Sequence, residues 1–244
     1  MVWIKKSTVA KIMALIVFLV AVGMTAIWPK NDSQNSLPDS SEVIMLPEPA
    51  LKGDVSMEEA IEKRRSIRSF TDESLTAENI SQLMWAAQGI TDETRMFRSA
   101  PSAGATYPLE VYIVTGTDGV RDENIPEGVY RYNPLDHSLK QVGTGDVRQD
   151  LYSAAIRQSP INTAPVNIII AADYSRTTAR YGDRGIRYVH MEAGHSAQNM
   201  YLQTAAMDIG MVVIGAFEDD AIKQILSMPA SHDPLYIIPV GHLR

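Results

Sequence analysis

The sequence predicts an α+β domain in which helices pack one mixed sheet. Three observations support that prediction. Apolar, β-branched runs such as residues 165–172 (PVNIIIAA) are typical of buried strands. Other segments place apolar residues at helical spacing and begin at residues that favour helix caps. Strands and helices alternate without a regular βαβ rhythm, which favours α+β over a parallel α/β arrangement.

The helices follow from their starting residues, taken in chain order. Ser56 and Glu59 fit a capping box that opens a short helix ending near residue 64. Thr76 opens a second helix, which Gly89 ends. Later helices are expected from Asp146 to about residue 158, over residues 187–209 and from about residue 219.

The strands are short and mostly apolar. Residues 129–133 and 138–142 flank the turn sequence PLDH and form a predicted hairpin. Further strands are expected over residues 111–115, 165–172, 211–214 and 235–240.

Composition limits the classes of function. The chain has 244 residues, of which 45% are hydrophobic, and a net charge of −7. Residues 1–30 hold four lysines and no acid, so residues 31–244 carry 18 basic and 29 acidic residues, a net charge of −11. A domain this acidic is a poor candidate for binding nucleic acid, which needs a basic surface. The absence of cysteine excludes disulfides, thiolate catalysis and cysteine-ligated metal centres.

The N-terminal 28 residues are expected to form a membrane anchor. Residues 12–28 contain no charge and would span about 26 Å as a helix, close to the thickness of a bilayer core. Lysines precede this stretch, so we expect the bulk of the chain on the extracytoplasmic side. The alternative is a cleaved signal peptide and a secreted protein. Residues 29–52, rich in Pro and Ser, are predicted to be a linker, and residues 53–244 the folded domain.

Residues 63–68 (KRRSIR) form the densest cationic cluster of this acidic domain. Several guanidinium groups and a hydroxyl within a few residues suit a phosphate, because arginine offers planar, bidentate donors. A solvated helix end, favoured by the helix dipole, explains the same cluster.

Residues 100–108 (APSAGATYP) form a loop of mostly small residues that leads into a strand. Such loops let the backbone approach a planar ligand closely. They also occur as ordinary turns between a helix and a strand.

The long helix offers few candidates for catalysis. Glu192 and His195 have the i, i+3 spacing of di-iron sites, but no second pair accompanies them, so no metal site is predicted. Small residues at Ala193, Gly194 and Ala197 favour packing against a partner instead. The sequence contains no GxSxG motif, no Walker A motif and no strand-borne GxGxxG motif.

Six segments together resemble the nitroreductase-like flavoproteins, specifically the SagB-type dehydrogenase branch. They occur in the family's order and cover roughly residues 55–244. The segments are RRSIRSF (64–70), LMWAAQGIT (83–91), SAPSAGATYPLEVYIV (99–114), GVYRYNP (128–134), RYGDRGIRYVHMEAGHSAQN (180–199) and PLYIIPVGH (234–242).

The resemblance implies a nitroreductase-like α+β fold with FMN at a homodimer interface. The arginine segment would bind the flavin phosphate and ribityl chain, the small-residue loop would line the flavin from the partner chain, and the segment after the long helix would contact the ring edge. The long helix would be the dimer seam. The implied cofactor-binding residues are Arg64, Arg65, Ser66, Arg68, Pro101, Ser102, Ala103, Gly104, Ile214, Gly215 and Ala216.

Two departures from the family matter. Azoline-oxidising relatives use a Lys-Tyr pair that aligns with Arg180 and Tyr181 here, and arginine cannot accept a proton near neutral pH. Tyr181 is therefore kept only as a candidate proton donor. Many relatives also continue past the last strand and place a basic residue on the phosphate. In this chain either Arg244 takes that role or the contact is missing.

The resemblance therefore predicts an FMN-dependent oxidoreductase. Two electrons would pass in a ping-pong reaction from NAD(P)H or another reductant to a small electron-poor acceptor, and the cofactor itself would carry the chemistry. The alternatives are a SagB-type azoline dehydrogenase in peptide maturation and a tethered module that binds flavin without turnover.

Overall fold

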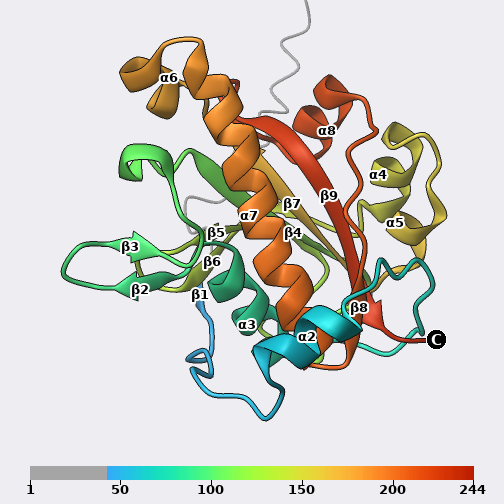
Figure 1. Ribbon diagram of the computed structural model, residues 1–244. Coiled ribbons are helices and arrows are strands. Elements are labelled where there is room, and N and C mark those ends of the chain that lie inside the picture. The colour runs from blue at the N-terminus through green and yellow to red at the C-terminus, as the bar shows by residue number, and fades with distance from the viewer. Residues whose placement is uncertain (1–42) are drawn as a thin grey trace, which may run out of the picture. The chain divides into compact units, whose positions relative to one another are not determined.

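A seven-stranded sheet forms the centre of the described part of the chain. The structure, a computed structural model, describes residues 43–244 (Figure 1). The strand order is β1-β6-β5-β4-β7-β9-β8, and all neighbouring pairs are antiparallel. A parallel bridge from Ser66 to Met211 in β8 adds to this edge, so the sheet is mixed, as predicted. The strands are β1 (Val43–Met45), β4 (Leu109–Thr115), β5 (Gly128–Asn133), β6 (Ser138–Thr144), β7 (Val166–Ala172), β8 (Ile209–Met211) and β9 (Asp233–His242).

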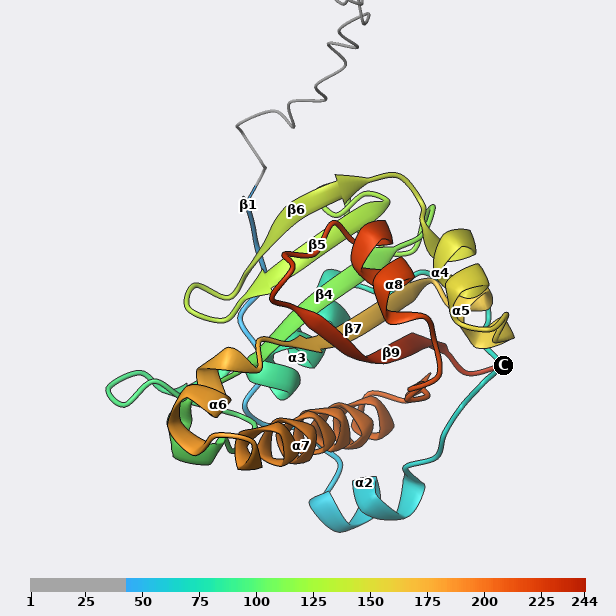
Figure 2. The same ribbon diagram turned by 90° about the horizontal axis from the view of Figure 1, so that it is seen from above.

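Helices cover both faces of the sheet because the central strands send alternate side chains into two apolar cores. In β4, Val111 and Ile113 join one core, and Tyr112 and Val114 join the other. Figure 2 shows α3 and α7 on one side of the sheet and α4, α5 and α8 on the other. Burial on both faces explains why these strands are continuous apolar runs. The covering helices are α3 (Ala77–Gln88), α4 (Arg148–Ala154), α5 (Ser159–Thr163), α7 (Arg184–Ala206) and α8 (Asp219–Ile225).

Side-chain caps start the first two helices, as predicted. The Ser56 hydroxyl accepts a hydrogen bond from the Glu59 amide (3.1 Å) at the start of α2 (Met57–Lys63). The Glu59 carboxylate instead forms an ion pair with Lys63, one turn later in the helix (2.7 Å). Only the Ser56 half of the predicted capping box is therefore present. At α3 the box is complete, because Thr76 and Asn79 each accept from the other's amide.

The helix predicted from Asp146 to about residue 158 is wrong in its start and its length. Asp146 binds the Arg148 amide (3.0 Å) and guanidinium (2.6 Å) from outside the helix, so it does not occupy the N-cap position of α4. Ile156 and Arg157 both have positive φ angles of 55°, which end the helical path before α5 begins. The predicted single helix therefore corresponds to α4 and the turn after it, and α5 is a separate helix that begins where the prediction ended.

The described part of the predicted linker packs against the domain. Val43 in β1 pairs with Lys140 in β6, and Leu46 is buried. Ala50 exchanges two hydrogen bonds with the Gln82 side chain of α3 (2.9 and 3.1 Å). The folded domain therefore begins before residue 53, and proline-rich composition concealed a strand that pairs only with a distant segment.

The remaining elements are short. The predicted hairpin is present as β5 and β6, whereas the long helix begins and ends about three residues before its predicted range. The segment predicted to form the anchor, residues 1–28, and the first part of the linker lie outside the described residues. Within residues 43–244, no helix is both long and apolar enough to cross a bilayer. The other elements are β2 (Ile90–Asp92), β3 (Phe97–Arg98), the 3₁₀ turn η1 (Ala103–Ala105) and α6 (Ser175–Tyr181).

Candidate functional site

The cationic segment of residues 64–68 runs along the β8 edge of the sheet. The Ile67 amide donates a hydrogen bond to the Met211 carbonyl (2.9 Å). A few residues later, Phe70 forms a bridge with Leu243 near the C-terminus. The last residues of the chain therefore lie beside the arginine segment, and Arg244 follows Leu243 in the same region.

Tyr201 in α7 connects residues 64–68 to the β8 edge of the sheet through hydrogen bonds. Its hydroxyl is hydrogen-bonded to the Ser66 hydroxyl (2.9 Å) and accepts from the Val213 amide (3.1 Å). The Arg64 guanidinium lies 5.1 Å from the centre of the Tyr201 ring, within the range of a cation–π contact. One side chain thus fixes the arginine segment and the chain after β8 relative to each other.

The arginines of this edge differ in what they bind. Arg65 donates from Nη1 to the carbonyls of Glu62 and Arg64 (2.7 and 2.8 Å), so it caps the end of α2. Arg68 and Arg244 are exposed and form no ion pair within residues 43–244. The two interpretations of the cluster therefore apply to different members: Arg65 satisfies a helix end, and the others are available to an anion.

The chain after β8 presents open backbone beside these arginines. Ile214 exchanges two backbone hydrogen bonds with Ile237 of β9 (both 2.9 Å), and Gly215 and Ala216 are exposed. A Cβ atom at Gly215 would come no closer than 4.0 Å to Tyr236. A ligand can therefore reach the backbone at this position.

The small-residue loop, residues 101–107, has a strained backbone. Gly104, Ala105 and Tyr107 have positive φ angles of 62°, 53° and 45°. Each non-glycine residue in this region costs about 1–2 kcal/mol, so other contacts must hold the loop. Pro101 and Gly104 are exposed, whereas Ser102 and Ala103 are half-buried.

Four contacts hold this loop, one within the loop and three with α6. The Ser102 hydroxyl accepts from the Tyr107 amide (2.9 Å), and Thr106 is hydrogen-bonded to Thr177 of α6 (2.8 Å). Two arginines of α6 also donate to loop carbonyls, at 3.0 Å from Arg176 and 3.1 Å from Arg180. These bonds fix the loop as a rigid, uncharged backbone surface.

Arg180 and Tyr181 lie directly against Gly104. A Cβ atom at Gly104 would overlap the Tyr181 hydroxyl and the Arg180 guanidinium. The Tyr181 ring packs edge to face on Tyr188, with ring centres 5.2 Å apart. The structure thus brings the candidate proton donor and the small-residue loop together, and it assigns Arg180 a role in holding that loop.

Glu192 lies buried beneath the same loop. Only 2% of its surface is exposed, and its Oε1 atom has no hydrogen-bond partner in the described part of the chain. Burial raises the pKa of this carboxyl to about 7, against opposing effects of the Ser102 hydroxyl and Arg98. The group can therefore gain or lose a proton near neutral pH.

The arginine segment and the small-residue loop lie at opposite ends of α7. Figure 1 shows α6 beside one end of the helix and α2 beside the other. From Glu192 under the loop to Tyr201 at the arginine segment, nine residues of helix span about 13 Å. Within one chain, the two predicted parts of the flavin site are therefore separated by about 13 Å along α7.

Comparison with known proteins identifies the family. The model of the nitroreductase family matches residues 61–242, which include both ends of α7. The chain belongs to the nitroreductase family. The Methanocaldococcus jannaschii protein named "Putative nitroreductase MJ1384" is 46% identical over 189 residues, which cover 77% of this chain and 91% of that protein.

Two further relatives are named for a trifolitoxin operon and for microcin B17 processing. The trifolitoxin operon protein TfxC of Rhizobium leguminosarum bv. trifolii is 30% identical over 73% of this chain and 53% of its own length. The microcin B17-processing protein McbC of Escherichia coli is 26% identical over 66% of this chain and 60% of its own length. These relatives confirm the resemblance to the SagB-type branch.

Solved structures show the same fold. A nitroreductase-type protein of Ralstonia eutropha JMP134 is 25% identical and superposes with a TM-score of 0.71, covering 84% of this chain and 91% of that one. The E. coli microcin synthetase McbBCD complex matches at 19% identity with a TM-score of 0.64, covering 99% of this chain and 95% of that one. The predicted nitroreductase-like α+β fold is therefore confirmed.

Sequence reasoning missed two residues, Tyr201 and Glu192, that contact the predicted site segments in the structure. An aromatic residue on a helix such as Tyr201 resembles core packing, and its hydroxyl contacts involve residues 135 positions earlier and 12 positions later. Glu192 was considered only as half of a metal pair, and spacing alone cannot reveal its burial. The one available signal was a polar residue on the buried side of an amphipathic helix.

Proposed function

We propose that this nitroreductase-family oxidoreductase binds FMN and passes two electrons from a reductant to a small electron-poor acceptor. The observation that carries the proposal is the β8 edge. There Tyr201 holds the arginine segment beside the open backbone of Gly215, with Arg244 on the same edge.

The residues of this edge fit FMN. Arg64, Arg68 and Arg244 offer charge-assisted donors to a phosphate, and the segment around Gly215 leaves its backbone open to a flat ring. Arg65 contributes less, because its Nη1 already binds two carbonyls. When bound, FMN supplies the two-electron chemistry, and the protein's part is to hold it and exclude side reactions.

A homodimer would complete the site. In one chain the loop of residues 101–107 lies about 13 Å along α7 from the arginine segment. A two-fold axis across α7 would place the loop of one chain against the arginine edge of the other. A mostly apolar groove of about 690 Å³ between α2, α3 and α7 offers a surface for this packing, with exposed Met57 and Ile61 beside it.

The test is the affinity of the full-length protein for FMN compared with riboflavin, which lacks the phosphate. We expect a flavin absorption spectrum and at least tenfold tighter binding of FMN. Arg68→Ala should remove most of that preference, whereas Arg121→Ala, an exposed arginine paired with Glu73, should leave it unchanged. Equal affinities for FMN and riboflavin would refute the phosphate assignment.

The electron donor is tested by anaerobic titration with NADH and NADPH. Bleaching of the flavin spectrum would support NAD(P)H as donor, and consumption in the presence of a nitroaromatic or quinone would exclude a binding module without turnover. No bleaching would indicate another donor, such as a membrane-derived reductant.

A second candidate is an azoline dehydrogenase, supported by the similarity to TfxC and McbC. Arg180 stands where azoline-oxidising relatives have lysine, and it donates to the Gly104 carbonyl. We expect no heterocycle oxidation by the natural chain. If Arg180→Lys also gives none on an azoline-containing peptide, this candidate fails.

We also propose that residues 12–28 anchor the protein with its domain on the extracytoplasmic side. Degradation of the domain by protease added to intact cells would support this orientation. Protection until lysis would contradict it, and release of a soluble, shortened chain would indicate a cleaved signal peptide.

A further inference from the structure

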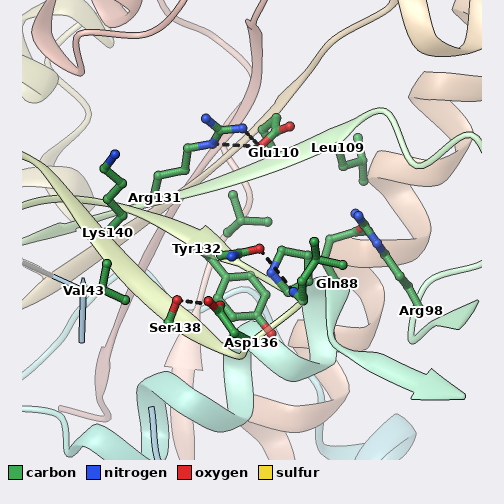
Figure 3. A pocket seen from close by; sticks show the side chains of 14 residues that line it. Val43, Gln88, Arg98, Leu109, Glu110, Arg131, Tyr132, Asp136, Ser138 and Lys140 are labelled. Carbon is green, nitrogen blue, oxygen red and sulfur yellow. Dashed lines mark hydrogen bonds and ion pairs between the residues drawn. The ribbon is translucent and has the colours of Figure 1, made fainter. Parts of the chain in front are cut away.

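A cavity of about 400 Å³ opens between β1, the β5–β6 hairpin and the start of β4 (Figure 3). It lies on the far side of the sheet order from the arginine edge. Three strand spacings, about 14 Å, separate β4 from β8. Apolar side chains form part of its wall, among them Val43, Leu109 and Leu135. The volume is in the range of small-molecule sites.

The carboxylates in the wall already have partners. Glu110 is bound by Arg131 (2.8 Å) and by Arg176 (2.5 Å), and Figure 3 marks its contact with Arg131. Asp136 accepts a hydrogen bond from the Ser138 hydroxyl (2.6 Å). These acidic groups therefore have little capacity left to bind a cationic ligand.

Three side chains of this cavity have donor groups that are not paired with a carboxylate. Arg98 donates to the Gln88 amide oxygen (2.9 Å) but forms no ion pair within residues 43–244, and burial lowers its pKa. The Gln88 Nε2 atom is buried and has no acceptor in the described part of the chain. Lys140 is exposed at the cavity and forms no ion pair within the same residues. Arg98, Lys140 and the Gln88 amide therefore retain donor capacity, whereas the carboxylates of the wall are already paired.

We propose that this cavity binds a small monocarboxylate with a compact apolar body. A carboxylate supplies the acceptors that Arg98 and Lys140 lack, and arginine can bind it in a bidentate manner. The apolar wall would cover the rest of the ligand. Glu110 and Asp136 disfavour a second negative charge, which selects against dianions such as phosphate. The cavity shares no lining residue with the arginine edge or with the loop of residues 101–107, although Arg98 lies 4.6 Å from the centre of the Tyr107 ring of that loop.

The test compares benzoate with benzamide, which has the same ring and no charge, by isothermal titration of the full-length protein. We expect benzoate to bind at least tenfold more tightly. Equal binding of the two compounds, or no binding of benzoate, would overturn the proposal whether or not the protein contains flavin.

Two variants locate the binding. Lys140→Ala should weaken benzoate about fivefold, whereas Lys52→Ala, which removes an exposed lysine at a different groove, should not. Gln88→Glu would place a carboxylate beside Arg98 and should abolish binding. Thermal unfolding checks that this buried variant folds, and Lys140→Ala provides the test if it does not. Benzoate affinity unchanged by Lys140→Ala would contradict the assignment.

Discussion

The two ends of α7 differ in whether the polar groups beside them already have hydrogen-bond partners. At the end near Tyr201, the arginine segment (residues 64–68) is held by a hydrogen bond between Ser66 and Tyr201. Its arginines are mostly exposed, and most of their donors have no hydrogen-bond partner. At the end near Glu192, the loop of residues 101–107 carries no charge, and its carbonyls and hydroxyls are bonded to α6 and to one another.

This difference shows how one fold can provide for two parts of a ligand. An anion needs donors that are not already satisfied, whereas a planar uncharged ring needs a backbone surface that does not move. The arginine end meets the first requirement and the loop end meets the second. Their separation along α7 is the reason that we propose a homodimer in which a second chain brings them together.

The loop end should respond to pH through Glu192. The pKa of this carboxyl is raised from 4.5 to about 7 by burial, so between those values the folded state binds more protons than the unfolded state. Stability therefore falls as pH rises through this window, by up to about 3 kcal/mol. Glu192→Gln should remove that loss, measured as free energy of unfolding in urea at pH 5 and pH 8.

The control for this prediction is Glu93→Gln, which changes an exposed carboxylate after β2. It should leave the pH dependence as in the natural chain. If the free energy of unfolding changes equally with pH in Glu192→Gln and Glu93→Gln, the buried Glu192 carboxyl does not govern the pH dependence of stability.

The loop backbone should not tolerate a side chain at Gly104. Gly104→Ala places a Cβ at positive φ and against Tyr181 and Arg180, so we expect a loss of about 2 kcal/mol in the free energy of unfolding. Gly53→Ala is the matched control, because nothing lies within 4 Å of a Cβ there. Equal stabilities of the two variants would show that the loop is not held as described.

Stability and FMN affinity at the arginine end should depend on the Tyr201 hydroxyl. Tyr201→Phe removes the hydrogen bonds to Ser66 and the Val213 amide while keeping the ring under Arg64. We expect a loss of about 1 kcal/mol in stability and about a fivefold loss of FMN affinity. Tyr152→Phe, in α4, should change neither, and an unaltered FMN affinity in Tyr201→Phe would contradict the fastening role.

The sequence predicted what local chemistry determines. Thr76 and Ser56 start their helices because a side-chain oxygen next to the helix satisfies its first amides. Asp146 has the same type of side chain but binds the amide and guanidinium of Arg148, two residues later, a competing local contact that the prediction did not consider. The strand β1 was missed because its partner β6 is almost a hundred residues away.

The candidate site shows the same difference between features that the local sequence determines and features that depend on distant contacts. The arginine segment and the small-residue loop were recognisable from composition and family resemblance. The contacts that connect them to the fold, from Tyr201, Glu192 and Arg180, depend on which residues meet in space.

The most direct test mixes two defective chains. Arg64→Ala/Arg68→Ala disables the arginine end, and Gly104→Ala disables the loop end. If each flavin site joins the arginine edge of one chain to the loop of the other, a heterodimer purified through two different tags contains one intact site. We predict about one FMN for every two chains in the heterodimer, and little in either parent. A heterodimer that binds no more FMN than its parents would show that both parts act within one chain.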